Sequence, residues 1–275
     1  MNQIPSNVQT IINDYIRLFD EHLPNALEGL YLHGSIALNA YEGESSDIDF
    51  IAVTNRRLTE YDFENLSIIH KKIEIKYKSE MDGVYILWDD IGKLHSINSV
   101  EHFLFYNDNE LSYGPYFNFN PITWFLLKNK GINVLGPMPS TFQYSDKSLD
   151  IVSYVKENMN TYWASRITWI ENSYEELIKL PSSQIEVEIE WSVLGILRQF
   201  YTLKENEIIS KINAGEYGLL HTTAESHNII KEAILIRKGE KKTLFHSNEE
   251  RIQSFIRFSK NLIEYCNKHF SVRLE

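Results

Sequence analysis

Two neighbouring stretches decide the fold: Leu30-Tyr31-Leu32-His33-Gly34-Ser35 and Ser46-Asp47-Ile48-Asp49-Phe50-Ile51-Ala52-Val53. The apolar run at the start of the first stretch has the length and composition of a short buried strand. Gly34 and Ser35 follow directly, where the chain must turn tightly and can expose backbone N–H groups. The second stretch ends in another apolar run, so the pattern predicts two buried strands with a tight turn after the first.

The two aspartates of the second stretch are spaced for one face of a strand. Residues i and i+2 of a strand point the same way, so Asp47 and Asp49 should project together while Ile48, Phe50 and Ala52 face the opposite side. Two carboxylates held this close repel each other unless a cation lies between them. Mg²⁺ binds in this way, with substrate phosphates and water as its other ligands, so the pair predicts a magnesium site.

This combination of a turn and a carboxylate pair resembles a known signature. Gly34-Ser35, an eleven-residue gap and Asp47-x-Asp49 resemble the nucleotidyltransferases of the DNA polymerase β superfamily. Within that superfamily the chain is most similar to the bacterial aminoglycoside adenylyltransferases that modify streptomycin or spectinomycin. The resemblance implies Mg²⁺-dependent transfer of AMP from ATP to an antibiotic hydroxyl, with Gly34 and Ser35 binding the β- and γ-phosphates.

A third carboxylate is implied by the same resemblance. The stretch 83–88 is apolar and rich in β-forming residues, so it predicts a third main strand, and Asp82 stands just before it. In the resembling family an acid at this place, usually Glu, acts as base toward the attacking hydroxyl, which assigns that role to Asp82. Glu80 and Glu74 are alternative candidates, and all three acids could equally be solvated charges before a strand.

The second half supplies three further candidates through the resemblance. The family has an acid that contacts the aminoglycoside, an Arg ten residues later and a Lys thirteen beyond that, and these positions are Glu188, Arg198 and Lys211 here. Arg198 and Lys211 would bind the triphosphate, where their charges neutralise the leaving pyrophosphate. All three residues could instead be ordinary surface charges.

An aromatic residue near the antibiotic is also implied by the family. The segment 95–114 is rich in aromatic residues, and Phe105 or Tyr106 would be the match. Aromatic residues at this density are more often core residues, so the alternative is that both are buried.

The lead-in to Glu188 bears on the choice of antibiotic. Members of the family that modify streptomycin carry a Trp and an Asp there, whereas this chain has Leu-Pro-Ser-Ser-Gln-Ile-Glu-Val-Glu at 180–188. The departure favours spectinomycin over streptomycin as the acceptor.

The pattern along the chain predicts two domains. Helical and strand signals alternate up to the Gly-Pro-Met-Pro-Ser break at 136–140, which predicts an α/β nucleotidyltransferase domain over 1–140, a mixed sheet with covering helices. Beyond it, periodic helical segments at 149–180, 186–204, 222–238 and 248–270 predict an all-α helical bundle over 141–275, with connections around 215–218 and 239.

Composition bounds the partners and the compartment. The net charge of −11 and the lack of a basic stripe argue against nucleic acid and favour a cationic small-molecule acceptor beside ATP. No apolar run is long enough to span a membrane. The single Cys266 and an N-terminus without an export pattern predict a cytoplasmic protein, which we expect to be a monomer.

Two alternatives to an antibiotic adenylyltransferase remain open at this point. One is the same catalytic fold with a different small-molecule or protein acceptor. The other is a non-catalytic nucleotidyltransferase-like binding module, such as the antitoxin of a toxin–antitoxin pair. The intact carboxylate pair and the large helical second half argue against the second.

Overall fold

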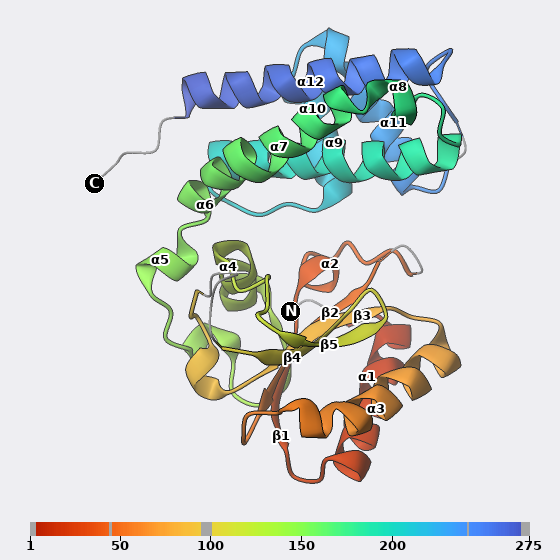
Figure 1. Cartoon of the computed structure of the whole chain (residues 1–275). Helices are drawn as coiled ribbons and strands as arrows, with labels where there is room; N and C mark the ends of the chain where they lie inside the picture. Colours follow the sequence, from red (N-terminus) through yellow and green to blue (C-terminus); the bar gives the residue numbers. More distant parts are fainter. Residues whose placement is uncertain (1–3, 44–45, 95–100, 241, 271–275) are drawn as a thin grey trace. The chain divides into compact units, whose positions relative to one another are not determined.

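The chain divides into two compact units, Met1–Asp150 and Ile151–Glu275 (Figure 1). The computed structural model describes residues 4–43, 46–94, 101–240 and 242–270. The sequence places the boundary at residue 140. The segment 141–150 belongs to the first unit because Phe142, Tyr144 and Leu149 pack against its core.

The first unit is built on a mixed sheet. Six strands of the described residues pair in the order β5-β4-β3-β2-β1-β6. The strands are β1 (Leu27–Leu32), β2 (Ile48–Thr54), β3 (Met81–Ile86), β4 (Phe103–Asn107), β5 (Glu110–Gly114) and β6 (Ile132–Leu135). Strands β2 and β3 run parallel, and the other pairs are antiparallel. A parallel pair needs a crossover connection, and helix α3 (Phe63–Tyr77) provides it between β2 and β3.

Helices cover both faces of this sheet. Helices α1 (Ser6–His22) and α3 (Phe63–Tyr77) lie side by side on one face, where they bury Ile48, Phe50 and Ala52 of β2 (Figure 1). Helix α4 (Pro121–Lys130) packs on the opposite face, where Trp124 and Leu127 meet the core formed by the alternate strand residues. The alternation of β2 therefore sends its apolar residues into two separate cores, as the sequence predicts.

Three strand assignments differ from the sequence prediction. Strand β3 begins at Met81, so Asp82 lies inside the strand and not before it. The described part of the aromatic-rich segment forms the β4–β5 hairpin, whose two-residue turn Asp108-Asn109 has positive φ at both positions, as a type I′ turn requires. Strand β6 was not predicted, because its four residues fall between Gly131 and the Gly-Pro break.

The second unit is helical over its described residues. Its main helices are α6 (Ile151–Asn158), α7 (Ala164–Asn172), α9 (Ser182–Glu205), α10 (Lys211–His221), α11 (His227–Arg237) and α12 (Asn248–His269). A π-helical turn over Met159–Trp163 joins α6 to α7. Shorter helices in the chain are α2 (Gly34–Ala37), α5 (Asp146–Leu149), α8 (Tyr174–Leu177), and the 3₁₀ turns η2 (Glu60–Asp62), η3 (Trp88–Asp90), η4 (Pro139–Thr141) and η6 (Ala224–Ser226). The predicted fold class, an α/β domain followed by an all-α region, is confirmed.

Helix α10 occupies a place where the sequence predicts a connection. Gly215 and Gly218 suggested a break, but both lie inside this helix. A Cβ at Gly215 would lie 2.6 Å from the side chain of Ile234, and one at Gly218 would lie 2.6 Å from Leu197. The two glycines therefore allow α10 to pack closely on α9 and α11.

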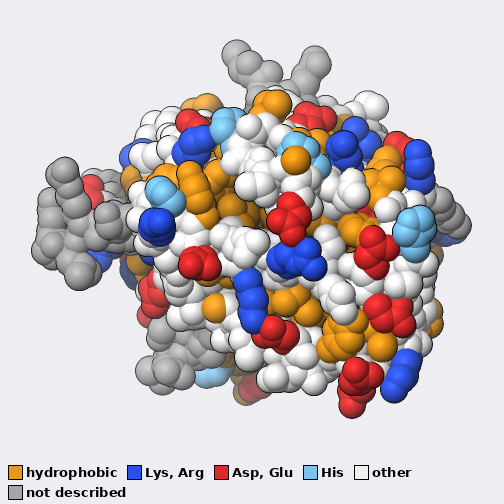
Figure 2. Space-filling view, turned by 90° about the horizontal axis from the view of Figure 1, so that it is seen from above, with side chains coloured by type: hydrophobic (Ala, Val, Ile, Leu, Met, Phe, Trp, Pro, Cys, Tyr) orange, Lys and Arg blue, Asp and Glu red, His pale blue; other side chains and the backbone are white. Residues whose placement is uncertain are grey.

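One face of the molecule shows how its surface charges are distributed. On the face shown in Figure 2, acidic and basic side chains are interspersed with apolar ones. Among the described helices, none combines the length and the apolar character needed to cross a bilayer.

Candidate functional site

Three aspartates gather where β2 and β3 begin. Strand β2 starts at Ile48, so Asp47 immediately precedes it and is exposed, while Asp49 is its second residue and partly buried. Asp49 pairs with Asp82 in the parallel register of β2 and β3. Partners in a sheet register point to the same face, so both carboxyls lie on one side of the sheet at adjacent positions.

The electrostatics of Asp82 show that the three acids interact. Burial, together with the negative charges of Asp47 and Asp49, raises the pKa of Asp82 to about 7. The backbone N–H of Asp108, at the β4–β5 turn, donates to Asp82 Oδ1 at 3.3 Å and opposes this shift. A carboxyl with a pKa near neutrality can both hold and release a proton at physiological pH.

The turn after β1 is shaped around Asp49. Gly34 has φ +56°, and a Cβ at this position would lie 1.7 Å from Asp49 Oδ2. The backbone N–H of His33 donates to the carbonyl oxygen of Asp49 at 3.1 Å. Only glycine fits here, because it tolerates the positive φ and leaves room for the carboxylate.

Ser35, the next residue, has a hydroxyl without a partner. Its Oγ is buried and forms no hydrogen bond with any described residue. Buried hydroxyls are nearly always hydrogen-bonded in folded proteins. Because Ser35 is the second residue of the short helix α2, which contacts β2 at the edge where the aspartates lie (Figure 1), this hydroxyl is suited to accept or donate to a bound polar group.

The residues fit a magnesium ion that is only partly enclosed by protein. Among the described side chains, no three acidic, histidine or cysteine groups converge to enclose an ion by themselves. Asp47 and Asp49 supply hard oxygen ligands, and Mg²⁺ is commonly held by one or two carboxylates together with substrate phosphates and water. The arrangement is therefore that of an ion bound together with its phosphorylated substrate.

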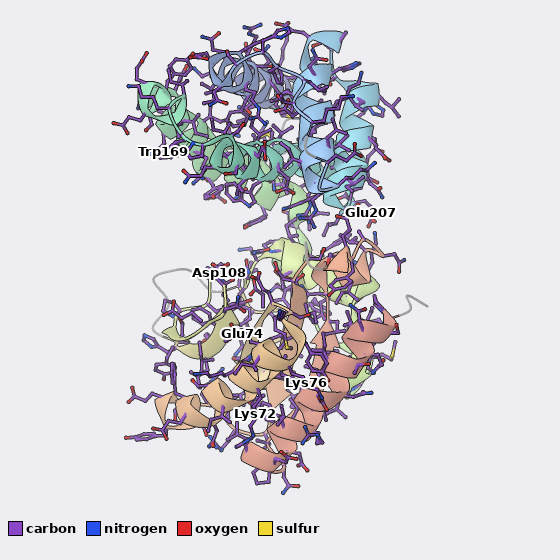
Figure 3. All side chains as sticks on the ribbon, turned by 90° about the vertical axis from the view of Figure 1, so that its right-hand side faces the viewer. Lys72, Glu74, Lys76, Asp108, Trp169 and Glu207 are labelled. Atoms are coloured by element: carbon purple, nitrogen blue, oxygen red, sulfur yellow. The ribbon has the colours of Figure 1, made fainter. Side chains whose placement is uncertain are left out.

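The alternative bases lie differently from Asp82. Glu74 is exposed on α3, the helix on the opposite face of the sheet (Figure 3). Glu80 is exposed before β3 and accepts a hydrogen bond from Asn109 Nδ2 at 3.2 Å. Of the three acids, Asp82 is the one in register with Asp49.

The two candidate aromatic residues separate onto opposite faces of β4. Phe105 pairs with Val84 and is partly buried on the face that carries the aspartates. Tyr106 points the other way, is 5% exposed, and stacks on His70 with ring centroids 3.7 Å apart. The structure therefore brings Phe105 toward the carboxylate face and leaves Tyr106 in the opposite core.

Tyr116 is a neighbour of the aspartates that the sequence did not single out. Burial raises the pKa of its hydroxyl, and the charges of Asp49 and Asp82 raise it further. Its ring lies 5.3 Å from that of Phe105 between centroids. Tyr116 lies just beyond the aromatic-rich segment 95–114, and only the density of aromatic residues around it could have marked it.

Two recesses of the first unit do not include the aspartates. One is lined by Trp88, Gly92 and Lys147 among others, and the second by Asn39 and Met138 among others.

In the second unit, Glu188 is already paired with a cation. Arg166 of α7 donates from Nε to Glu188 Oε1 at 3.1 Å and from Nη2 to Oε2. Ser192 Oγ donates to Oε1 at 2.6 Å. Glu186, Glu188 and Glu190 all lie within α9.

Arg198 and Lys211 lie near each other, and Lys211 is paired with Glu190. Lys211 Nζ donates to Glu190 Oε1 at 3.1 Å, and Arg237 Nη1 lies 3.5 Å from the same oxygen. Arg198 Nε donates to the carbonyl oxygen of Ile209, two residues before Lys211. Burial lowers the pKa of Lys211; the charge of Glu190 opposes this, and those of Arg237 and Arg198 add to it.

This cluster carries more positive than negative charge. Lys211 and Arg237 share the Glu190 carboxylate, and the charge of Arg198 acts on Lys211. Guanidinium and ammonium groups gathered in this way are the donors that bind phosphates. Arg237 was missed at the sequence level because nothing in its spacing connects it with Glu190, 47 positions earlier.

Comparison with known proteins agrees with this picture. Residues 159–261 match the family model described as the aminoglycoside adenylyltransferase C-terminal domain. No curated protein matches the chain.

Solved structures supply the second comparison. The chain is similar to the spectinomycin adenyltransferase AAD(9) from Enterococcus faecialis, crystallised with ATP and spectinomycin, with a TM-score of 0.65. The identity is 19%, over 93% of this chain and 99% of that one, so this likeness is one of fold. A toxin–antitoxin structure with AMP-PNP shares 15% identity over 56% of this chain and 95% of its own, with a TM-score of 0.30, too low to carry an argument.

The family resemblance drawn from the sequence is thereby confirmed, and it rests on the second half of the chain as well as on the signature that suggested it. Residues 159–261 are thus similar to the C-terminal domain of the aminoglycoside adenylyltransferases, and the fold over 93% of the chain is similar to that of AAD(9).

Proposed function

We propose that this chain transfers AMP from ATP to a hydroxyl group of an aminoglycoside-type antibiotic, with spectinomycin favoured over streptomycin, and thereby confers resistance. The observation that carries the proposal is the register pairing of Asp49 with Asp82, next to Asp47 and the Gly34 turn. It supports a site at this edge of the sheet in which two acids would hold an ion and the third would accept a proton.

Each residue of the first unit has a role in this proposal. Asp47 and Asp49 would hold Mg²⁺, which would neutralise phosphate charge and polarise the α-phosphorus of ATP. Ser35 offers its unpartnered hydroxyl, and Gly34 its side-chain-free backbone, to the β- and γ-phosphates. These groups fix the triphosphate so that its α-phosphorus is open to attack from one side.

Asp82 is proposed as the base. Its carboxylate takes the proton of the acceptor hydroxyl, whose oxygen forms a bond to the α-phosphorus as the bond to pyrophosphate breaks. The pKa near 7 supports this role, because about half of the Asp82 carboxyls are ionised at neutral pH and can accept a proton. The protonated carboxyl is also stable enough at this pH to hold the proton that it takes from the hydroxyl. Asp is one methylene shorter than Glu, so the hydroxyl must approach the strand more closely.

Arg198 and Lys211 are proposed to bind the triphosphate of ATP. Their support is that the charges of Arg198 and Arg237 act on Lys211, so that three cationic side chains lie close together. Glu188 and Phe105 remain proposals for the acceptor, although Glu188 must first exchange its partner Arg166.

The test is a panel of aminoglycosides incubated with the protein, ATP and Mg²⁺, and read by mass spectrometry for the mass of one added AMP. We expect spectinomycin to gain one AMP and pyrophosphate to be released in equal amount. Expression in a susceptible bacterium should raise the inhibitory concentration of the same antibiotic. Absence of the adduct for every acceptor, with ATP bound, would point to a different acceptor and reject the proposal as stated.

A further inference from the structure

Glu188 lies in a site that is built for a cation and filled by the chain itself. Both carboxylate oxygens receive donors from the guanidinium of Arg166, through Nε and Nη2. This paired contact is the geometry in which a guanidinium fits a carboxylate best. Ser192 adds a third donor on Oε1, so every oxygen of Glu188 is already hydrogen-bonded.

Aromatic rings complete the site. The guanidinium carbon of Arg166 lies 5.0 Å from the ring centroid of Trp191 and 5.3 Å from that of Trp169. Both distances are within the range at which a cation is attracted to an aromatic face. Trp169 is 50% exposed and lies on α7 (Figure 3), so the site opens to solvent.

The backbone beside this site departs from α-helical geometry. Residues Met159–Trp163 form a π-helical turn, a feature that occurs frequently at functional sites. The turn sets Tyr162 and Trp163 against Trp191, with ring centroids 5.8 Å and 4.9 Å away. The Nε1 of Trp163 is buried and has no hydrogen-bond partner among the described residues, which is an unusual arrangement for an indole in a purely structural role.

We propose that Arg166 is a specificity-determining residue. It occupies the cation site formed by Glu188, Trp169 and Trp191. It thereby excludes ligands that would bind by placing their own guanidinium group against the Glu188 carboxylate. A ligand guanidinium must displace the guanidinium of Arg166. Because Arg166 is part of the same chain, its effective concentration at the site is in the millimolar range or above. The ligand gains nothing in contact energy by the exchange, so it does not bind here in the native chain. Removal of Arg166 opens the site to such ligands.

The binding test uses methylguanidinium as the probe and tryptophan fluorescence as the readout, since Trp169 and Trp191 border the site. Arg166→Ala should bind the probe at least tenfold more tightly than the native chain. The double variant Arg166→Ala with Glu188→Gln should lose this binding, because the carboxylate is removed. Arg257→Ala is the matched control, since Arg257 pairs with Glu225 elsewhere in the same unit and its loss should leave probe binding at the native level.

Two outcomes would overturn the proposal. Equal binding of the probe by the native chain and by Arg166→Ala would show that Arg166 blocks nothing. Equal binding by the single and double variants would place the probe away from Glu188. Because Arg166→Ala leaves a partly buried carboxylate without its cation, circular dichroism should accompany the measurement, and Arg166→Met, which retains an aliphatic stem, is the second variant.

The consequence for the acceptor rests on the proposed function and needs a separate measurement. The ratio of kcat/KM for AMP transfer to streptomycin, which carries guanidinium groups, over that for spectinomycin, which carries none, should rise at least tenfold in Arg166→Ala. The change should lie in KM, because Arg166 affects ligand binding and not the chemical step. No transfer to any acceptor by either protein would count against the proposed function, while the methylguanidinium result would still decide the role of Arg166.

Discussion

Asp49 and Asp82 occupy paired positions on two adjacent parallel strands, so that their carboxyls lie on the same face of the sheet. Like charges at neighbouring positions destabilise a sheet, and here Asp47 adds a third. A fold retains such a cluster where a ligand compensates it. The cluster is therefore the feature of the first unit that most directly indicates chemistry.

Removing one charge of the ion-binding pair should stop the reaction without unfolding the chain. In Asp49→Asn the side chain keeps its volume but loses its negative charge, so we expect AMP transfer to fall by at least about a thousandfold, as expected when a group that stabilises the transition state is lost. Mass spectrometry of the adduct measures the rate, and Asp20→Asn, an exposed position on α1, is the control. Native activity in Asp49→Asn would show that this residue holds no ion.

The choice of base can be settled among three acids. Asp82→Asn should lower kcat at least about a hundredfold, within the contribution of a general base, while ATP binding in the presence of Mg²⁺ stays within a few-fold of native. Glu74→Gln and Glu80→Gln should retain native rates, because both residues are exposed and neither is in register with Asp49. A large loss in Glu80→Gln with none in Asp82→Asn would transfer the role to Glu80.

The turn at Gly34 should not tolerate a side chain. In Gly34→Ala the new Cβ would collide with Asp49 Oδ2 at 1.7 Å, so Asp49 must move and transfer should be lost. Gly239→Ala is the matched control: it also has positive φ, at +72°, but nothing lies within 4 Å of its Cβ. In both variants the positive φ should lower the unfolding free energy by about 1 kcal/mol, which urea unfolding measures. Only the first should lose activity.

Stability should depend on pH through His70. Burial lowers the pKa of His70 to about 3, its Nε2 is within 2.7 Å of the Tyr85 hydroxyl, and its ring stacks on Tyr106. The unfolded chain protonates this residue below about pH 6.5 and the folded chain does not, so folding stability is lost as pH falls from 6.5 toward 3. The slope from this residue approaches about 1.4 kcal/mol per pH unit.

The comparison that isolates this effect is urea unfolding of the native chain and of His70→Gln at pH 6.5, 5.5 and 4.5. The difference in unfolding free energy between the two proteins should shrink or reverse as the pH falls, because glutamine does not titrate. A constant difference across this range would show that His70 titrates alike in the folded and unfolded chains.

The second unit contains an ion pair that is fully buried, between Arg251 and Glu232. Their side chains are 3% and 0% exposed, and Arg251 also donates to Ser182 Oγ at 2.8 Å. Arg251→Met leaves a buried carboxylate unpaired, so we expect a loss of about 3–5 kcal/mol in unfolding free energy. Arg257→Met removes an exposed pair and should cost under about 1 kcal/mol. Similar losses of unfolding free energy in Arg251→Met and Arg257→Met would show that burial does not determine the cost of breaking the ion pair.

Local patterns revealed the carboxylate edge of the sheet because all of its determinants lie close together in sequence. The alternation of Asp47 to Val53 and the glycine at position 34 are readable without any knowledge of distant contacts, and the structure has Ile48 and Phe50 buried opposite Asp49. The site around Glu188 was not readable in this way. Its partner Arg166 lies on another helix, and no periodicity connects the two.

The acids of α9 show the same limit. They stand at alternate positions, 186, 188 and 190, so the three acids do not all share one helix face. Glu186 lies 3.6 Å from Arg251, Glu188 pairs with Arg166, and Glu190 pairs with Lys211. Each acid is explained by a partner on a different helix, and only the packing of the bundle determines which.

Strand β6 pairs with β1 and so borders a strand that comes 100 residues earlier in the chain. A shortened form of the protein that stops before Ile132 would expose one whole side of β1, with its amide and carbonyl groups unpaired, as a template for association with other copies. Anyone expressing the first unit by itself should therefore keep the chain through β6, or expect aggregates in place of a soluble fragment.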